Sequence, residues 1–284
     1  WAGRLAQALG DMDEAERRLR ELLQVSEECE DLVSRRLALS GLGNLAEYRA
    51  EYGLAEEFYT ECLELSRQAE DQRGVATSMG NLGLVAQRRG DLSTARAYFE
   101  AAGEHFGALG LQPQVSVSLN NLCVLSILEG DLETARELGG RSLEIRQLLG
   151  DASGVAGSRT NLATIEMRGG RLQEAAGHAA EALKLNVELG SMYQVPGCLE
   201  VSGEILCEAG QPALSARLFA RADQVRRDMG TPTSEEERKA REPQLRRLEE
   251  LLGHEQVRAE RELGETGELD SLVEFTRERL AAVE

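Results

Sequence analysis

Along this chain, apolar and polar residues recur at the spacing of amphipathic helices, and the pattern itself returns about every forty residues. In four of the repeats, an asparagine on the polar side of a predicted helix lies nine residues before a glycine. The four pairs are Asn44 and Gly53, Asn81 and Gly90, Asn121 and Gly130, and Asn161 and Gly170. A fixed long period predicts a structural unit stacked along an axis, because an enzyme motif seldom repeats itself.

Glycines mark the predicted turns. They are Gly10, Gly53, Gly90, Gly130, Gly170 and Gly210, with separations of 43, 37, 40, 40 and 40 residues. Related phrases follow most of them: GDMDEA, GDLSTA, GDLETA and GRLQEA. Glycine suits the left-handed end of a helix, and the aspartate can cap the next helix. Each repeat is therefore predicted to be a helix A, a tight turn at the glycine and a helix B.

One side of each helix A is less apolar than the opposite side. On a helical wheel, with about 100° per residue, the asparagine shares this side with the residues four before, three after and seven after it. We call these four positions the A-helix row. In the first of these repeats they are Ser40, Asn44, Glu47 and Glu51. The opposite positions are mostly apolar, so the asparagines are predicted to point away from the core.

The spacing and the residues of these repeats resemble tetratricopeptide repeats of the long variety, with roughly 40 residues each. Segment 78–102, SMGNLGLVAQRRGDLSTARAYFEAA, shows the resemblance most closely. Its residues in the family's positions are Leu82, Gly83, Gly90, Ala95 and Ala102. The resemblance is strong over residues 75–190 and implies an all-α fold, a right-handed α-solenoid (superhelix) of helix-turn-helix repeats.

In the family that these repeats resemble, the A helices line a concave groove. The resemblance therefore implies that Asn44, Asn81, Asn121 and Asn161 face the groove, where the matching asparagine commonly bonds the backbone of an extended peptide. An amide side chain offers two donors and an acceptor, which suits both backbone groups of such a ligand. The alternative is structural: each asparagine could bond a neighbouring helix and hold the angle between repeats.

The middle of the A-helix row is apolar, where solvent would favour charge. Its apolar members are Leu84, Val117, Val124 and Leu128. Arg88 and Arg168 flank this patch, Thr164 belongs to the same row, and the row of the last repeat is Gly197, Glu204 and Glu208. An exposed apolar patch ringed by polar groups is a common mark of a binding surface, and arginines can receive a carboxylate. Alternatively, the arginines pair with nearby glutamates and the patch packs against neighbouring helices.

The repeats are expected to end near Gly230. We predict a solenoid of about six repeats, the first truncated, over residues 1–230, and a C-terminal helical cap over residues 231–284, where charge is dense and the period is lost. Residues 216–284 resemble the C-terminal tail of large LuxR-type and AfsR-type bacterial regulators. These belong to the STAND class, the signal-transduction ATPases with numerous domains. That resemblance implies a sensor region with an ATPase domain upstream.

The N-terminal end has a feature of its own. Trp1 falls in the asparagine slot of a repeat whose helix A is missing, and no methionine precedes it. We interpret the sequence as a fragment of a longer protein whose exposed stacking face self-associates or packs against an upstream domain.

The composition of the chain limits the kinds of partner and site that we expect. The chain carries 50 acidic and 32 basic residues, a net charge of −18, which opposes direct binding to nucleic acid. Its five cysteines form no CxxC pair, which indicates reduced thiols in a cytoplasmic protein. The three histidines lie far apart, so no metal site is expected, and no apolar run reaches the roughly 18 residues that a bilayer requires.

We find no residues for catalysis and expect no cofactor. The sequence lacks a GxxxxGK[ST] phosphate loop, and no histidine has a plausible serine or cysteine partner. Two functions remain. One is a sensor module, in which a peptide, protein or small inducer in the groove controls an upstream ATPase; the other is a constitutive scaffold, as in kinesin-light-chain-like adaptors. The sequence leaves open the ligand, the output domain and the oligomeric state.

Overall fold

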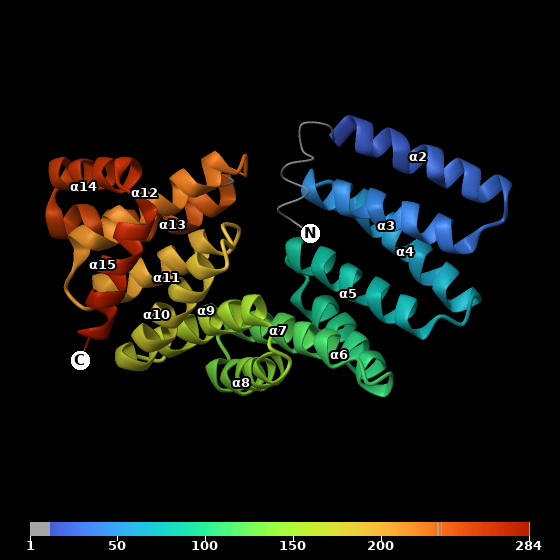
Figure 1. Cartoon of the computed structure of the whole chain (residues 1–284), viewed down its shortest axis with the longest axis horizontal. Coiled ribbons are helices and arrows are strands. Elements are labelled where there is room, and N and C mark those ends of the chain that lie inside the picture. The colour runs from blue at the N-terminus through green and yellow to red at the C-terminus, as the bar shows by residue number, and fades with distance from the viewer. Residues whose placement is uncertain (1–11, 232, 234, 284) are drawn as a thin grey trace. The chain divides into compact units, whose positions relative to one another are not determined.

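The structure, a computed structural model, describes residues 12–231, 233 and 235–283. All elements in this part of the chain are α-helices (Figure 1). The helices are α2 (Met12–Glu28), α3 (Leu32–Tyr48), α4 (Tyr52–Gln68), α5 (Gln72–Arg88), α6 (Leu92–Ala108), α7 (Gln112–Glu129), α8 (Leu132–Leu148), α9 (Ala152–Arg168), α10 (Leu172–Glu188), α11 (Val195–Glu208), α12 (Pro212–Asp228), α13 (Glu235–Leu252), α14 (His254–Thr266) and α15 (Leu269–Ala281). The predicted all-α fold is confirmed.

The helices form two compact units. The first holds residues up to Ile145 and the second those from Arg146, so the division lies within α8. Inside each unit, helices that follow one another in the sequence pack against each other, as α5 and α6 do in the first and α11 and α12 in the second (Figure 1). The odd-numbered helices α3 to α11 are the predicted A helices and the even-numbered helices α4 to α12 are the B helices.

Most turns follow the expected chemistry. From Gly90 to Gly230, a glycine with positive φ ends a helix every twenty residues. Aspartates cap the helices that follow: the carboxylates of Asp31, Asp71, Asp91, Asp131 and Asp151 accept hydrogen bonds from backbone N–H groups two or three residues ahead. These caps satisfy donors that a helix N-terminus leaves free.

The predicted turn at Gly53 is wrong. Gly53 lies inside α4, and the left-handed residue of this turn is Ala50, with φ of 58°. Backbone hydrogen bonds close the turn without glycine: Ala50 N–H donates to Glu47 O at 3.0 Å and Glu51 N–H to Ala46 O at 2.8 Å. The turns that join helix A to helix B are therefore a uniform forty residues apart, from Ala50 to Gly210. Gly10 and Trp1 lie outside the described residues.

Within a repeat, a glycine on helix A lies against an aromatic ring on helix B, so that a small residue packs opposite a large one. Gly83 lies against the ring of the fully buried Phe99, where an added Cβ would come within 2.7 Å of Cε1. Gly43 meets the ring of Tyr59 in the same way, at 2.5 Å. Where the B helix has a small residue at this level, as at Ala179, the A helix has Ala163 in place of glycine. At Gly43 and Gly83, the absence of a side chain on helix A thus leaves room for the aromatic ring of helix B.

The predicted cap segment forms three helices, all in the second unit. The first, α13, packs against α12 and α14; α14 also lies along α12, and α15 packs against α10 and α11. Gly264 permits the close approach of α14, since a Cβ there would lie 2.3 Å from the carbonyl oxygen of Arg217. The boundary near residue 230 stays a prediction.

Candidate functional site

The corrected turn shifts the A-helix row of the first described repeat by three residues. Its asparagine slot is Gly41, and Asn44 instead aligns with Leu84 of the next repeat. The row there becomes Leu37, Gly41, Asn44 and Tyr48, in place of Ser40, Asn44, Glu47 and Glu51. The expected ladder of four asparagines in one slot is therefore reduced to Asn81, Asn121 and Asn161.

The asparagines differ in their contacts. Asn44 is exposed, and its Oδ1 accepts a hydrogen bond of 2.7 Å from the hydroxyl of Tyr59, which is fully buried in α4. Asn44 thus ties helix A to helix B of its own repeat, as the structural alternative proposed. Asn81 and Asn121 are half-buried, and neither side chain forms a hydrogen bond with another residue of the described chain. Asn161 is half-buried and has a polar partner.

In the first unit, the A-helix row borders a cleft of about 500 Å³ between α3 and α5. Thr77 and Asn81 of the row lie in its wall, with Leu37 opposite. Leu37 is 63% exposed, so the cleft presents apolar surface beside an amide. Arg36 reaches across the cleft from α3 and pairs with Asp71, the residue that caps α5. The cleft therefore has fixed walls.

The predicted apolar patch lies on α5 and α7 and is only partly free. Val117 is 50% exposed and Leu128 55% exposed, while Val124 is half-buried. Leu84 is half-buried and packs against the core cluster around Phe99. Val117 and Leu128 thus present apolar surface to a ligand, whereas Leu84 shares in the packing between helices.

Both predicted arginines lie near glutamates. Burial raises the pKa of Glu47, and the charge of exposed Arg88 opposes this rise. In the second unit, burial raises the pKa of Glu204, and the charge of Arg168 opposes the rise in the same way. Arg168, Glu204 and Glu208 line a second cleft, of about 390 Å³. Thr164, one turn before Arg168, donates its hydroxyl to the carbonyl of Thr160 at 3.2 Å.

The thiol that lines the first cleft is not suited to nucleophilic chemistry. Burial raises the pKa of Cys62 to about 12, so the thiol stays protonated near neutral pH. Within the described residues, no group of three or more histidine, cysteine, aspartate or glutamate side chains could hold a metal ion. No helix among these residues is long and apolar enough to cross a bilayer.

Sequence reasoning missed Leu37 and Tyr48, which belong to the corrected row. Both are exposed, at 63% and 41%. The signal that would have found them is the spacing of sixteen residues from Gly43 to Tyr59, which matches the spacing from Gly83 to Phe99. That match fixes the register of the first repeat independently of its turn.

The sequence profile of the tetratricopeptide repeat family matches residues 1–68 and 34–104. The crystal structure of BtubC (BKLC) from P. vanneervenii has a TM-score of 0.58 and 26% identity, over 66% of this chain and 78% of that one. The fold is that of tetratricopeptide repeats. Two other similar structures agree with this fold. The apo form of RapI has a TM-score of 0.64 and 18% identity, with 80% of each chain covered.

The third similar structure, a putative kinesin light chain from Podosopora anserina with nearly identical TPR-like repeats, has a TM-score of 0.50 and 17% identity. The match covers 82% of this chain and 98% of that one. No curated protein sequence matches the chain. Tetratricopeptide repeats are generally non-catalytic modules that bind proteins, and their solenoids offer extended binding surfaces. The resemblance to STAND regulators stays a prediction.

Proposed function

We propose that this chain is a non-catalytic module that binds a protein or an extended peptide along its A-helix row. The observation that carries the proposal is the cleft of about 500 Å³ in the first unit, whose wall holds Asn81 of the row. Apolar surface at Leu37 and amide groups at Asn81 and Asn121 would act on different parts of a peptide. A side chain would enter the cleft, and the amides would bond its backbone.

The charges of the row suit this role. Arg73 is exposed and lines the cleft, and Arg88 is exposed two turns beyond Asn81. Either guanidinium can bind a carboxylate of the ligand. A net charge of −18 makes direct binding to nucleic acid unfavourable, so the proposed partner is a protein or peptide. None of the five cysteines forms a disulfide in the described part of the chain, which supports a reducing compartment such as the cytoplasm.

The test is a double substitution, Asn81→Ala with Asn121→Ala. Peptides selected on the unchanged protein from a random display library serve as the probe, and isothermal titration calorimetry measures their affinity. Loss of two amides is expected to weaken binding by about 1–3 kcal/mol, because each net hydrogen bond contributes about 0.5–1.5 kcal/mol. Helicity and melting temperature should stay nearly unchanged, since both side chains lack hydrogen-bond partners in the described chain.

Gln68→Ala is the matched control, because Gln68 is an exposed amide at the end of a B helix, away from the row. It should leave affinity unchanged. Retained binding in the double variant would refute the proposed site, and unfolding of that variant would show that the two amides are structural.

For the biological setting, we propose the ligand-sensing or partner-sensing domain of a bacterial STAND-type signalling or transcriptional regulator. Its support is the resemblance of residues 216–284 to the tails of such regulators. Ligand binding would control an upstream ATPase only if the affinity differs between the two states of the regulator. The alternative is a constitutive scaffold that holds its partner without switching. A phosphate-loop motif encoded upstream of Trp1 in the native gene would support the sensor, and its absence the scaffold.

Self-association through the N-terminal end is a separate proposal. It concerns the segment that begins at Trp1, which lies outside the described residues. Light scattering over a range of concentrations tests it, and a strictly monomeric protein at high concentration would refute it.

A further inference from the structure

In the second unit, α13 contacts Glu208 of the A-helix row of the last repeat and Glu200 on the same helix. Arg241 pairs with Glu200 of α11 and also donates to Asp223 of α12 at 2.7 Å. Six residues later, Arg247 donates to Glu208 of α11 at 3.0 Å. The two contacts follow the same order along both helices, so α13 runs along α11 in the same direction.

The surface that α13 contacts is acidic. Glu200, Glu204 and Glu208 are spaced by four residues and therefore share one face of α11, which we call the acidic row. Glu204 and Glu208 belong to the A-helix row, the same row that borders an open cleft between α3 and α5 in the first unit. In the last repeat, residues of α13 form part of the cleft wall: Gln244, Arg247 and Leu248. A segment of the chain itself thus borders the row there.

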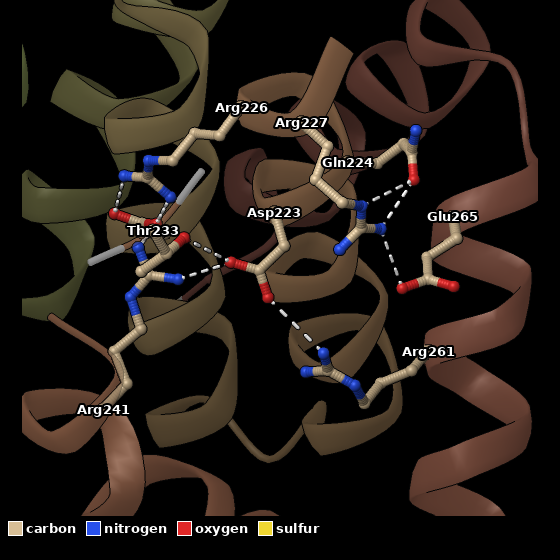
Figure 2. Close-up of polar contacts among 9 residues, drawn as sticks. Asp223, Gln224, Arg226, Arg227, Thr233, Arg241, Arg261 and Glu265 are labelled. Carbon is tan, nitrogen blue, oxygen red and sulfur yellow. Dashed lines mark hydrogen bonds and ion pairs between the residues drawn. The ribbon is translucent and has the colours of Figure 1, made fainter. Parts of the chain in front are cut away.

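Ion pairs form a large part of the contact of α13 with α11 and α12. Figure 2 shows Asp223 of α12 between Arg241 of α13 and Arg261 of α14, with Arg226 beside them. Arg226 also pairs with Glu200, so this carboxylate is shared by arginines from α12 and α13. The pairs of Arg241 are mostly buried, so removing this arginine leaves carboxylates without their partner, whereas the pair of Arg247 with Glu208 is half-exposed.

The apolar part of the contact involves the end of α13. Leu248 is 1% exposed and packs with Leu252 in a cluster that holds Phe219 of α12 and Val257 of α14, whereas Leu251 is 55% exposed. Pro243 lies inside α13, and a proline in a helix interior removes a backbone hydrogen bond and weakens the helix. Helix α14 has a further contact with α12 at Gly264, which lies against the backbone of Arg217. This contact of α14 does not depend on α13.

From these contacts we infer that α13 is an internal ligand: it occupies the acidic row of α11 until a basic, leucine-bearing helix of a partner protein displaces it. The inference rests on the proposed function, since it treats the row as a binding surface, but it concerns another part of that surface. The partner's chemistry follows from α13 itself. It has two arginines six residues apart and a leucine directly after the second, which match Arg241, Arg247 and Leu248.

Glu204 explains why a partner could bind better than α13. It lies between the two paired glutamates, and within the described residues no hydrogen bond or ion pair of its own neutralises it. Burial raises the pKa of its carboxyl, while the charges of Arg168 and Arg241 oppose the rise. A partner helix with a third basic residue would pair this carboxylate as well.

The experiment uses the whole chain and a fluorescein-labelled peptide with the sequence of residues 235–252, EEERKAREPQLRRLEELL. Anisotropy measures its affinity for the unchanged protein and for the double variant Arg241→Ala with Arg247→Ala. The variant's own α13 is a weaker competitor, so the peptide is expected to bind about tenfold more tightly. Hydrogen exchange should rise in α13 and stay unchanged in α14 and α15.

Arg246→Ala is the matched control. Arg246 is adjacent to Arg247, but among the described residues its ion pair is with Glu242 of α13 itself, so its removal should change neither the affinity nor the exchange. Adding Glu208→Gln to the double variant should lower the peptide affinity again, because it removes the carboxylate that receives the second arginine. Arg247→Ala alone, at a half-exposed pair, should act in the same direction with a smaller change.

Two results would overturn the inference. Faster exchange in α13 without peptide binding would show that the acidic row is no docking surface. Unchanged exchange in both arginine variants would show that the ion pairs do not hold α13. Because the readout is a peptide on α11, it is independent of Asn81 and Asn121, and failure of the groove in the first unit would leave it unaffected.

Discussion

The match between Gly83 and Phe99 predicts that the best helix former is harmful at this position. In Gly83→Ala, the new Cβ would lie 2.7 to 3.1 Å from three atoms of the Phe99 ring. The ring is fully buried, so it has little room to move. Overpacking of this kind destabilises by about 1–3 kcal/mol. Alanine recovers about 0.5–1 kcal/mol of helix propensity, so a net loss of up to about 2.5 kcal/mol is expected.

Gly80→Ala is the internal control. Gly80 lies in the same helix, and no atom within 4 Å would meet its added Cβ. This substitution should stabilise the protein by about 0.5–1 kcal/mol through helix propensity alone. Urea unfolding followed by circular dichroism gives both values from the shift of the midpoint. Equal stability of the two variants would refute the size match, because the ring would then be free to yield.

A double-mutant cycle sharpens the test. Phe99→Ala alone should cost about 3–5 kcal/mol, because it opens a cavity in the core. Combined with Gly83→Ala, it recreates the pair Ala163 and Ala179 of a later repeat. The double variant should therefore be more stable than the sum of the single effects, and strict additivity would contradict the argument.

Two further predictions concern groups beside the A-helix row. Tyr59→Phe removes the hydrogen bond to Asn44 and should lower the free energy of unfolding by about 1 kcal/mol, measured by urea unfolding; an unchanged value would mean that Asn44 is held by other contacts. Burial raises the folded pKa of Glu204 above its ordinary value of 4.5, so its ionised form opposes folding. Glu204→Gln should therefore raise the melting temperature at pH 7, with a gain that disappears as the pH falls below 4.5, and a constant gain would contradict the titration.

Local chemistry explains how much of this fold is predictable from the sequence. Helical periodicity depends on residues three or four apart, and a cap such as Asp91 depends on the N–H groups of the next turn. Both signals involve residues only a few positions apart in the sequence, so the helices, most of their turns and their order of stacking could be predicted. The turn at Ala50 was missed because its left-handed residue is not glycine, and the error moved Asn44 out of the shared slot.

By itself, the sequence determined a series of amphipathic helices with one less apolar row on each helix A, because both follow from local spacing. Tertiary structure alone decided what meets the row. It brings Asn44 into a hydrogen bond with Tyr59, places Asn81 beside a cleft and pairs Arg241 of α13 with Glu200 of α11. These residues lie fifteen to forty-one positions apart in the chain, and only the packing of whole helices determines which of them come into contact.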